Sequence, residues 1–223
     1  MINMAEMNLF QQLLYYTEQN GFYIWEQFVR HFLISIYGVL LAAVIGIPLG
    51  FVIAKRSHLA GWVIGAANVI QTIPSLAMLS ILMLGLGLGV NTVIWTVFLY
   101  SLLPIIKNTY AGVRNVNNVL LDAGKGMGMT QWQMTTKIEL PLALSVIMAG
   151  IRNALVVGIG VTAIGTFIGA GGLGDIITRG VNATDGGAII LAGAIPTALM
   201  AVLSDVILGW VESRLDPSNR KKK

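Results

Sequence analysis

The sequence predicts an all-α, polytopic membrane helix bundle with about five spans, on the evidence of its composition and of the length of its uncharged stretches. Of the 223 residues, 56% are hydrophobic and only 11% are charged, and the mean hydropathy is +0.77. A soluble domain carries about 25% charged residues, so these side chains cannot cover a water-exposed surface. This composition excludes a cytosolic enzyme, a nucleic-acid-binding protein and a disordered chain. Cysteine is absent, which excludes disulfides, thiolate zinc sites and a catalytic thiol.

The predicted spans follow stretches of about 20 apolar residues, the length that crosses a bilayer. The second and third spans share one uncharged stretch of 48 residues, Leu59–Ile106. The chain therefore has to turn near Gly87, because glycine adopts positive φ at no steric cost. The five spans are placed at residues 31–54, 60–84, 91–110, 142–168 and 187–210, within a transmembrane domain of residues 28–212.

Prolines occur in or at the start of every predicted span. Pro48, Pro74, Pro104 and Pro196 are expected to kink their helices, since proline removes a backbone hydrogen bond. Pro141 is expected to open the fourth span, because the first helical turn tolerates proline.

The basic residues set the orientation of the predicted spans. Five spans place 11 of the 14 lysines and arginines on one side, and basic residues favour the cytoplasmic side of short loops. The N-terminus is therefore predicted outside the cell and the C-terminus inside. Residues 1–27 are expected to form an extracellular amphipathic segment, with a mobile tail as the alternative, and residues 213–223 form a basic cytoplasmic tail.

Two charged residues and several polar ones fall within the spans. Arg152 and Asp205 would each cost about 2.5–3.5 kcal/mol at the bilayer centre, so Asp205 is expected to have a structural partner. Polar groups in spans should face protein or water, which makes some of them candidates for a solute path; hydrogen bonding between helices is the alternative for each. The candidates are Asn68, Gln71, Thr72, Ser75, Asn153, Thr162 and Thr166.

A glycine-rich run after the fourth span matches the G-x-G-x-x-G dinucleotide fingerprint. That fingerprint has meaning only between a strand and a helix of a βαβ unit, which a membrane bundle lacks. The run is instead predicted to form a tight turn or gate at the outer mouth of the bundle, with Gly169, Gly171, Gly172, Gly174 and Asp175 as its residues.

The long hydrophilic loop at residues 114–141 is predicted to contain two short helices around Gly128. Thr130 and Gln133 have capping-box spacing at the start of the second helix. Exposed apolar residues suit this loop to docking a soluble partner on the cytoplasmic side. A helical hairpin lying on the membrane is the alternative.

This loop resembles the EAA loop of ABC-transporter permeases, whose pattern is Glu-Ala-Ala, three residues, Gly, nine residues and Ile-x-Leu-Pro. The spacing here fits throughout, with Asp122 in place of glutamate and Gly124 in place of the second alanine. The resemblance implies a coupling helix, Asp122–Gly128, that inserts into a cleft of a separate ATPase. The matching residues are Asp122, Ala123, Gly124, Gly128, Ile138, Leu140 and Pro141.

Further runs resemble the permeases of osmoprotectant importers of the type I class. They are Gly46-Ile-Pro48-Leu-Gly50, Gln71-Thr-Ile-Pro74-Ser-Leu-Ala and Phe167-Ile-Gly-Ala-Gly-Gly-Leu-Gly174-Asp175. Such permeases carry glycine betaine, carnitine, choline and related quaternary amines. The last run is shared with methionine-type permeases, so another small solute such as an amino acid is the alternative cargo.

The resemblance also implies the partners and the setting. A non-catalytic chain in the bacterial cell membrane would pair with an identical or paralogous permease, two cytosolic ATPases that use ATP and Mg, and an extracellular binding protein. No cofactor or metal is expected on this chain, and no nucleic acid. A secondary transporter and, more remotely, an intramembrane enzyme are the rival classes.

Overall fold

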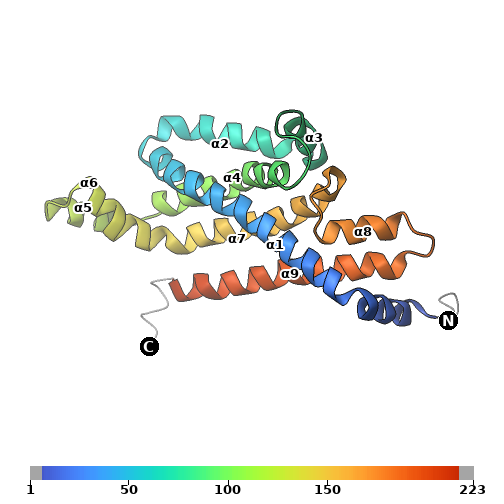
Figure 1. The fold of residues 1–223 in the computed structure, drawn as a ribbon. Coiled ribbons are helices and arrows are strands. Elements are labelled where there is room, and N and C mark those ends of the chain that lie inside the picture. The colour runs from blue at the N-terminus through green and yellow to red at the C-terminus, as the bar shows by residue number, and fades with distance from the viewer. Residues whose placement is uncertain (1–6, 216–223) are drawn as a thin grey trace. The chain divides into compact units, whose positions relative to one another are not determined.

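The computed structural model describes residues 7–215, and every regular element in that part of the chain is a helix (Figure 1). In chain order these are α1 (Leu9–Lys55), α2 (Ser57–Thr72), α3 (Ser75–Leu86), α4 (Val90–Arg114), α5 (Asn118–Gly126), α6 (Gln131–Met134), a π-helix (Thr135–Glu139), α7 (Leu140–Ile164), a 3-10 helix (Gly165–Ile168), α8 (Leu173–Val181) and α9 (Gly187–Leu215). Most of the predicted basic tail, residues 216–223, and the first six residues of the predicted N-terminal segment lie outside the described residues.

Helix α1 is much longer than the span predicted at its C-terminal end. It begins at Leu9 and ends at Lys55, with non-helical dihedral angles only at Asn20 (φ −118°, ψ 15°). The N-terminal segment and the first predicted span are therefore joined by one interrupted helix. Pro48 lies inside this helix without ending it.

The second predicted span differs from the prediction of one kinked helix. Helices α2 and α3 are separate and bend by 98° at the break, which contains Ile73 and Pro74. Proline lacks a backbone N–H and disfavours the helical conformation of the residue before it, so both residues oppose a continuous helix here. The turn after α3 confirms the glycine prediction, since Gly87 and Gly89 have φ of 78° and 104°.

The fourth predicted span also begins differently. Helix runs without a break from Gln131 through the π-helix into α7, so Pro141 lies inside a helical segment and does not open it. The Leu140 N–H bonds back to the carbonyl of Thr135, and this wider turn makes room for the proline ring next to it. Pro104 and Pro196 likewise lie inside α4 and α9.

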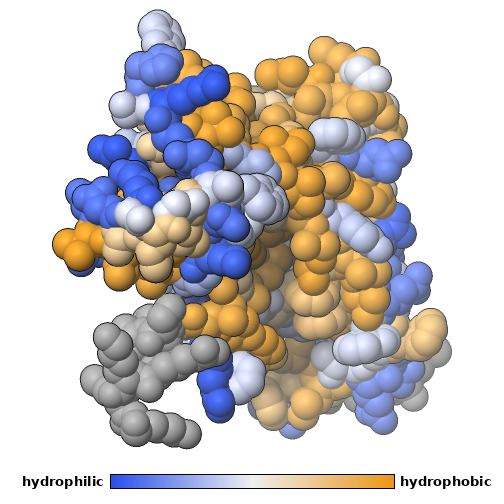
Figure 2. Space-filling model, turned by 90° about the vertical axis from the view of Figure 1, so that its left-hand side faces the viewer, coloured by the Kyte–Doolittle hydropathy of each residue, from blue (hydrophilic) through white to orange (hydrophobic). Residues whose placement is uncertain are grey.

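Four of the described helical segments are long and apolar enough to cross a membrane, and the bent pair α2 and α3 would make a fifth. Large apolar side chains remain exposed along them, including Leu84 (86%) and Trp62 (81%). Hydrophobic side chains cover much of the face seen in the space-filling view (Figure 2). Such a surface is typical of helices that contact lipid, so the chain is a multi-pass membrane protein.

The chain divides into two compact units, and α1, α4, α7 and α9 each contribute residues to both. The first unit contains α3 and α8 together with the N-terminal part of α1, and its described residues are 7–38, 73–98 and 156–203. Gly38 of α1 lies against Val97 of α4 so closely that a Cβ atom would come within 2.5 Å of the valine side chain. This close approach of two helix backbones is what small residues permit in membranes.

The second unit comprises residues 39–72, 99–155 and 204–215 in the described part of the chain. Its buried residues include an apolar cluster of Ala54, Val113, Ala143 and Ile147 and another of Ile53, Ala60 and Ile106. Gly50 fits against Thr109 of α4 where a Cβ atom would lie only 2.5 Å from the threonine Cβ. The predicted loop with its two short helices belongs to this unit.

Candidate coupling loop, outer turn and polar pocket

The first helix of the candidate coupling loop forms as the sequence predicts. Asn117 caps α5, its side-chain oxygen accepting a hydrogen bond from the Val119 N–H at 2.9 Å. The helix ends at Gly126, and Gly128 then adopts a φ of +74°, a conformation that glycine adopts at no steric cost. The predicted glycine corner is therefore confirmed.

The second helix begins with the predicted capping box. The Thr130 N–H donates to Gln133 Oε1 at 2.8 Å, and the Gln133 N–H donates to Thr130 Oγ1 at 3.3 Å. These reciprocal bonds satisfy two backbone donors that the start of a helix leaves free. Helices α5 and α6 lie beside one another in Figure 1.

Gly124, which stands in place of the second alanine of the EAA pattern, lies at a close contact between helices. A Cβ atom there would lie 2.6 Å from Met134 Sδ and 2.8 Å from Ile138 Cδ1, so α5 packs closely on the second helical segment of the loop. Leu140 and Pro141 are half-buried, like Ile138, whereas Asp122 and Ala123 are exposed. The matched residues thus divide into a packed set and a set that faces solvent.

The exposed side of the loop is apolar as well as charged. Val119, Met127 and Trp132 are 71–75% exposed. Asp122 pairs only with Lys125, at 3.1 Å, among the described residues. Large apolar side chains exposed beside charged ones are typical of surfaces that contact a protein partner.

A polar contact that sequence reasoning missed ties the loop to the end of α1. The Lys55 ammonium lies 3.2 Å from Glu139 Oε2, and Lys55 Nζ also donates to Thr135 Oγ1. The Thr135 hydroxyl in turn donates to Glu139 at 2.8 Å. Glu139 is 8% exposed, so this carboxylate is buried and paired, and the π-helix is fixed to α1.

The glycine-rich run forms a tight turn between the 3-10 helix and α8. Gly169, Gly171 and Gly172 have φ of 75°, 72° and 84°, which accounts for three of the glycines. Gly174 is required for a different reason, because a Cβ atom would lie 2.0 Å from the Ala163 carbonyl oxygen. The predicted tight turn is confirmed in shape; its role as an outer gate stays a prediction.

Two side chains of α1 hold this turn, and sequence reasoning did not identify them. Gln27 Oε1 accepts from the Gly172 N–H at 2.8 Å, and His31 Nδ1 accepts from the Leu173 N–H at 3.2 Å. His31 Nε2 lies 3.0 Å from the Ile159 carbonyl, so the imidazole is neutral with its proton on Nε2. The signal was available: Gln27, His31 and Ser35 recur every four residues on one face of an apolar helix.

Asp175 closes the turn by pairing with groups on α1 and α8. Its Oδ2 accepts from the Tyr23 hydroxyl at 2.6 Å and from Arg179 Nε at 2.7 Å. The Arg179 guanidinium also lies over the Tyr23 ring, 5.1 Å from its centroid. The hydrogen bond that Arg179 donates to Asp175 raises the pKa of Arg179 above its ordinary value.

The seven candidate path residues are divided between the two units. Thr162 is fully buried and its hydroxyl lies 2.9 Å from Ser35 Oγ. Thr166 is half-buried on the 3-10 helix, and Ser75 begins α3. Asn68 and Thr72 are exposed on α2.

Gln71 and Asn153 are the two that the structure brings together. Both line a pocket of about 400 Å³ in the second unit, which is formed by α2, α4 and α7. Its other lining residues are Leu103, Pro104, Lys107, Asn108 and Ala111.

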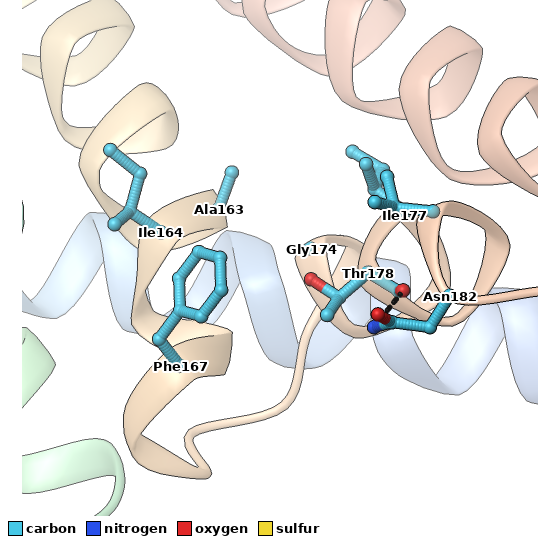
Figure 3. A pocket seen from close by; sticks show the side chains of 8 residues that line it. Ala163, Ile164, Phe167, Gly174, Ile177, Thr178 and Asn182 are labelled. Atoms are coloured by element: carbon cyan, nitrogen blue, oxygen red, sulfur yellow. Dashed lines mark hydrogen bonds between the residues drawn. The ribbon is translucent and has the colours of Figure 1, made fainter.

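The first unit has a separate, mainly apolar pocket of about 330 Å³ beside the glycine turn. Phe167 lines it from the 3-10 helix, and Ile177, Thr178 and Asn182 line it from α8 and its end (Figure 3). The Asn182 amide donates to the Thr178 carbonyl at 2.8 Å, so its own carbonyl oxygen is left for another partner.

The two charges within the spans are paired with each other. Arg152 of α7 donates to both carboxylate oxygens of Asp205 on α9, with Nη2 at 2.8 Å, and Nη1 lies 3.3 Å from Glu212. The predicted structural partner of Asp205 is thereby identified as Arg152.

The apolar helices make this chain a polytopic membrane protein as a class, and the similarity to known proteins gives its family. The family model of the binding-protein-dependent transport system inner membrane component matches residues 46–217. The chain therefore belongs to this family.

Curated relatives match nearly the whole chain. The carnitine transport permease protein OpuCD of Listeria monocytogenes is 66% identical over 217 residues, which cover 97% of each chain. The glycine betaine/carnitine/choline transport system permease protein OpuCD of Bacillus subtilis is 63% identical, over 97% of this chain and 94% of its own.

A solved structure of the MetNI methionine ABC transporter, in an inward-facing conformation, has the same fold. Its TM-score is 0.72 with 20% identity, and the match covers 86% of this chain and 94% of that one. This likeness confirms the type I permease fold.

Proposed function

We propose that this chain is the transmembrane permease subunit of an ATP-driven importer of osmoprotectant quaternary amines such as glycine betaine, carnitine and choline. The observation that carries the proposal is the 63–66% identity, over 97% of the chain, to permeases named for those solutes. The similarity to the methionine transporter is 20% in sequence and supports the fold alone, so an amino-acid cargo is the weaker alternative.

The candidate coupling loop is the proposed contact with the ATPase. Its exposed apolar residues and the exposed Asp122 would dock in a cleft of that subunit, while Gly124 and Ile138 hold the loop together. ATP and Mg would be bound by the ATPase, and this chain would have no catalytic role. Closure of an ATPase pair on ATP would move two such loops and rock the attached helices, so that the path opens toward the extracellular binding protein.

The proposed arrangement in the bacterial cell membrane places the N-terminus outside and the C-terminus in the cytoplasm. Two permease copies, identical or paralogous, would form the path, and the glycine turn held by Gln27 and His31 would serve as part of the outer gate. A loaded binding protein would deliver solute at that side.

Reconstitution tests the assignment of cargo and energy source. The permease, the ATPase and the binding protein are placed in proteoliposomes, and uptake of radiolabelled glycine betaine, carnitine and choline is measured with and without ATP. We expect ATP-dependent uptake of at least one of these amines and none of methionine. Uptake that proceeds without the ATPase would instead establish a secondary transporter.

The substitution Gly128→Pro tests the coupling loop. Proline fixes φ near −65°, whereas Gly128 has φ +74° and donates its N–H to the Lys125 carbonyl at 2.9 Å, so the corner cannot form. We expect uptake to be abolished while the chain still inserts into the membrane. Normal uptake by this variant would contradict a coupling role for the loop.

A further inference from the structure

The polar pocket of the second unit differs from its surroundings in carrying a charge without a partner. Lys107 is the one charged residue that lines it, and the Lys107 side chain is exposed and makes no ion pair with any described residue. The Asn153 side chain, on the facing helix α7, is also exposed and has no hydrogen bond within the described chain. An exposed ammonium group without an ion-pair partner is free to form a charge-assisted hydrogen bond with an anionic group of a ligand.

Pro104 in α4 determines how the side-chain amides of Gln71 and Asn108 are oriented in the pocket. Pro104 has no N–H to donate to the Tyr100 carbonyl, and Gln71 Nε2 lies 3.5 Å from that oxygen. The Asn108 amide donates to the Pro104 carbonyl at 2.7 Å. Each amide donor is turned toward the backbone, which leaves the carbonyl oxygens of Gln71 and Asn108 as acceptors.

Helix α7 passes this site at close range. A Cβ atom at Gly150 would lie 2.7 Å from Asn108 Cβ and 2.9 Å from the Pro104 carbonyl oxygen. This contact holds Asn108 in place and sets Asn153, one turn further along, on the pocket wall. The pocket thus combines a cation and a free amide with carbonyl oxygens.

We propose that this pocket binds the carboxylate of a zwitterionic quaternary amine during transport, with the Lys107 ammonium pairing with the carboxylate and the Asn153 amide donating a second hydrogen bond. The inference rests on the proposed function. Glycine betaine and carnitine carry a carboxylate, whereas choline carries a hydroxyl and a net positive charge. Lys107 therefore attracts the first two and repels choline, so the site discriminates between cargoes of one transporter.

Uptake by the complete reconstituted transporter tests this charge dependence. Lys107→Met removes the ammonium and keeps the length of the side chain, and Lys107→Arg keeps the charge. We expect the ratio of glycine betaine to choline uptake to fall about tenfold in Lys107→Met, because losing a hydrogen bond to a charged group weakens binding by about that factor. In Lys107→Arg the ratio should return to the value of the unmodified transporter. Arg56→Met removes an exposed basic residue outside the pocket and is the matched control.

A thiol-protection assay measures occupancy of the pocket without relying on the binding protein. The chain has no cysteine, so Ala111→Cys places a single thiol on the pocket wall. Modification of this chain by a cationic methanethiosulfonate reagent is followed by mass spectrometry in the purified complex. Glycine betaine should slow the modification and choline should not, and the additional change Lys107→Met should remove the protection.

The outcomes separate the inference from the proposed function. If the wild-type transporter moves none of the quaternary amines, the proposed function fails. If it moves glycine betaine but Lys107→Met leaves both the uptake ratio and the thiol protection unchanged, the pocket assignment is overturned and the function stands. Equal loss of uptake for both solutes, with protection intact, would likewise overturn it.

Discussion

At the residue scale, the side chains that shape this protein are the few polar ones inside apolar helices. Gln27 and His31 lie four residues apart on α1 and accept hydrogen bonds from consecutive backbone N–H groups of Gly172 and Leu173. These are the donors that the start of α8 leaves free, and burial would make them costly if they had no acceptor. Two side chains of α1 therefore perform the capping that no residue of α8 supplies.

Gln27→Ala tests this capping. The substitution leaves the buried Gly172 N–H without its acceptor, which we expect to lower the free energy of unfolding by about 1–3 kcal/mol. The midpoint of thermal unfolding of the purified chain in detergent is the measurement. Glu26→Ala, at the exposed neighbouring position, is the control and should leave the midpoint unchanged. Equal midpoints for the two variants would show that the turn stands without Gln27.

Gly124 allows a graded test of the packing within the candidate coupling loop. Alanine meets the flexible ends of Met134, Ile138 and Met129 and gains about 1 kcal/mol of helix propensity, so Gly124→Ala should retain uptake. Leucine is too large for the gap, and Gly124→Leu should separate α5 from the π-helix and abolish uptake. The same change at Gly61, where nothing lies within 4 Å, is the control. Full uptake with Gly124→Leu would refute the packing argument.

At the element scale, the sequence predicted what local chemistry decides and missed what tertiary contacts decide. The capping box at Thr130 and the positive φ of Gly128 follow from residue type and spacing, and both were predictable. The 98° bend at Pro74 and the continuous helix through Pro141 could not be predicted, because both residues are prolines within apolar sequence and yet they behave differently. The difference is a π-helical turn before Pro141, and Glu139 in that turn pairs with Lys55, which lies far away in the sequence.

The ion pairs that Arg152 of α7 forms with α9 predict the relative stability of variants on the two helices. Arg152→Leu leaves Asp205 and Glu212 without their cation, whereas Asp205→Leu leaves Arg152 with Glu212 as a partner. The first variant should therefore be the less stable one in detergent, and the double variant should be more stable than Arg152→Leu alone. Thermal unfolding midpoints of the three proteins decide this order. A double variant less stable than Arg152→Leu would show that the charges act independently.

At the scale of the whole molecule, the number of crossings decides which loops share a side of the membrane. Four described segments are long enough to cross, and the bent pair α2 and α3 either makes the fifth crossing or returns to the side it came from. Five crossings place the end of α1 and the candidate coupling loop on the same side, and four place them on opposite sides. The distribution of basic residues favours five, because both regions carry lysine or arginine.

Single cysteines distinguish these topologies, since the chain has none of its own. Arg56→Cys, Lys125→Cys and Thr184→Cys replace exposed residues after α1, in α5 and between α8 and α9. With a membrane-impermeant maleimide on intact cells, we expect labelling of Thr184→Cys alone, and labelling of the other two only after permeabilisation. Labelling of Lys125→Cys but not Arg56→Cys in intact cells would mean that α2 and α3 turn back within the membrane. The loop would then face away from the cytosol, and an ATPase could not reach it.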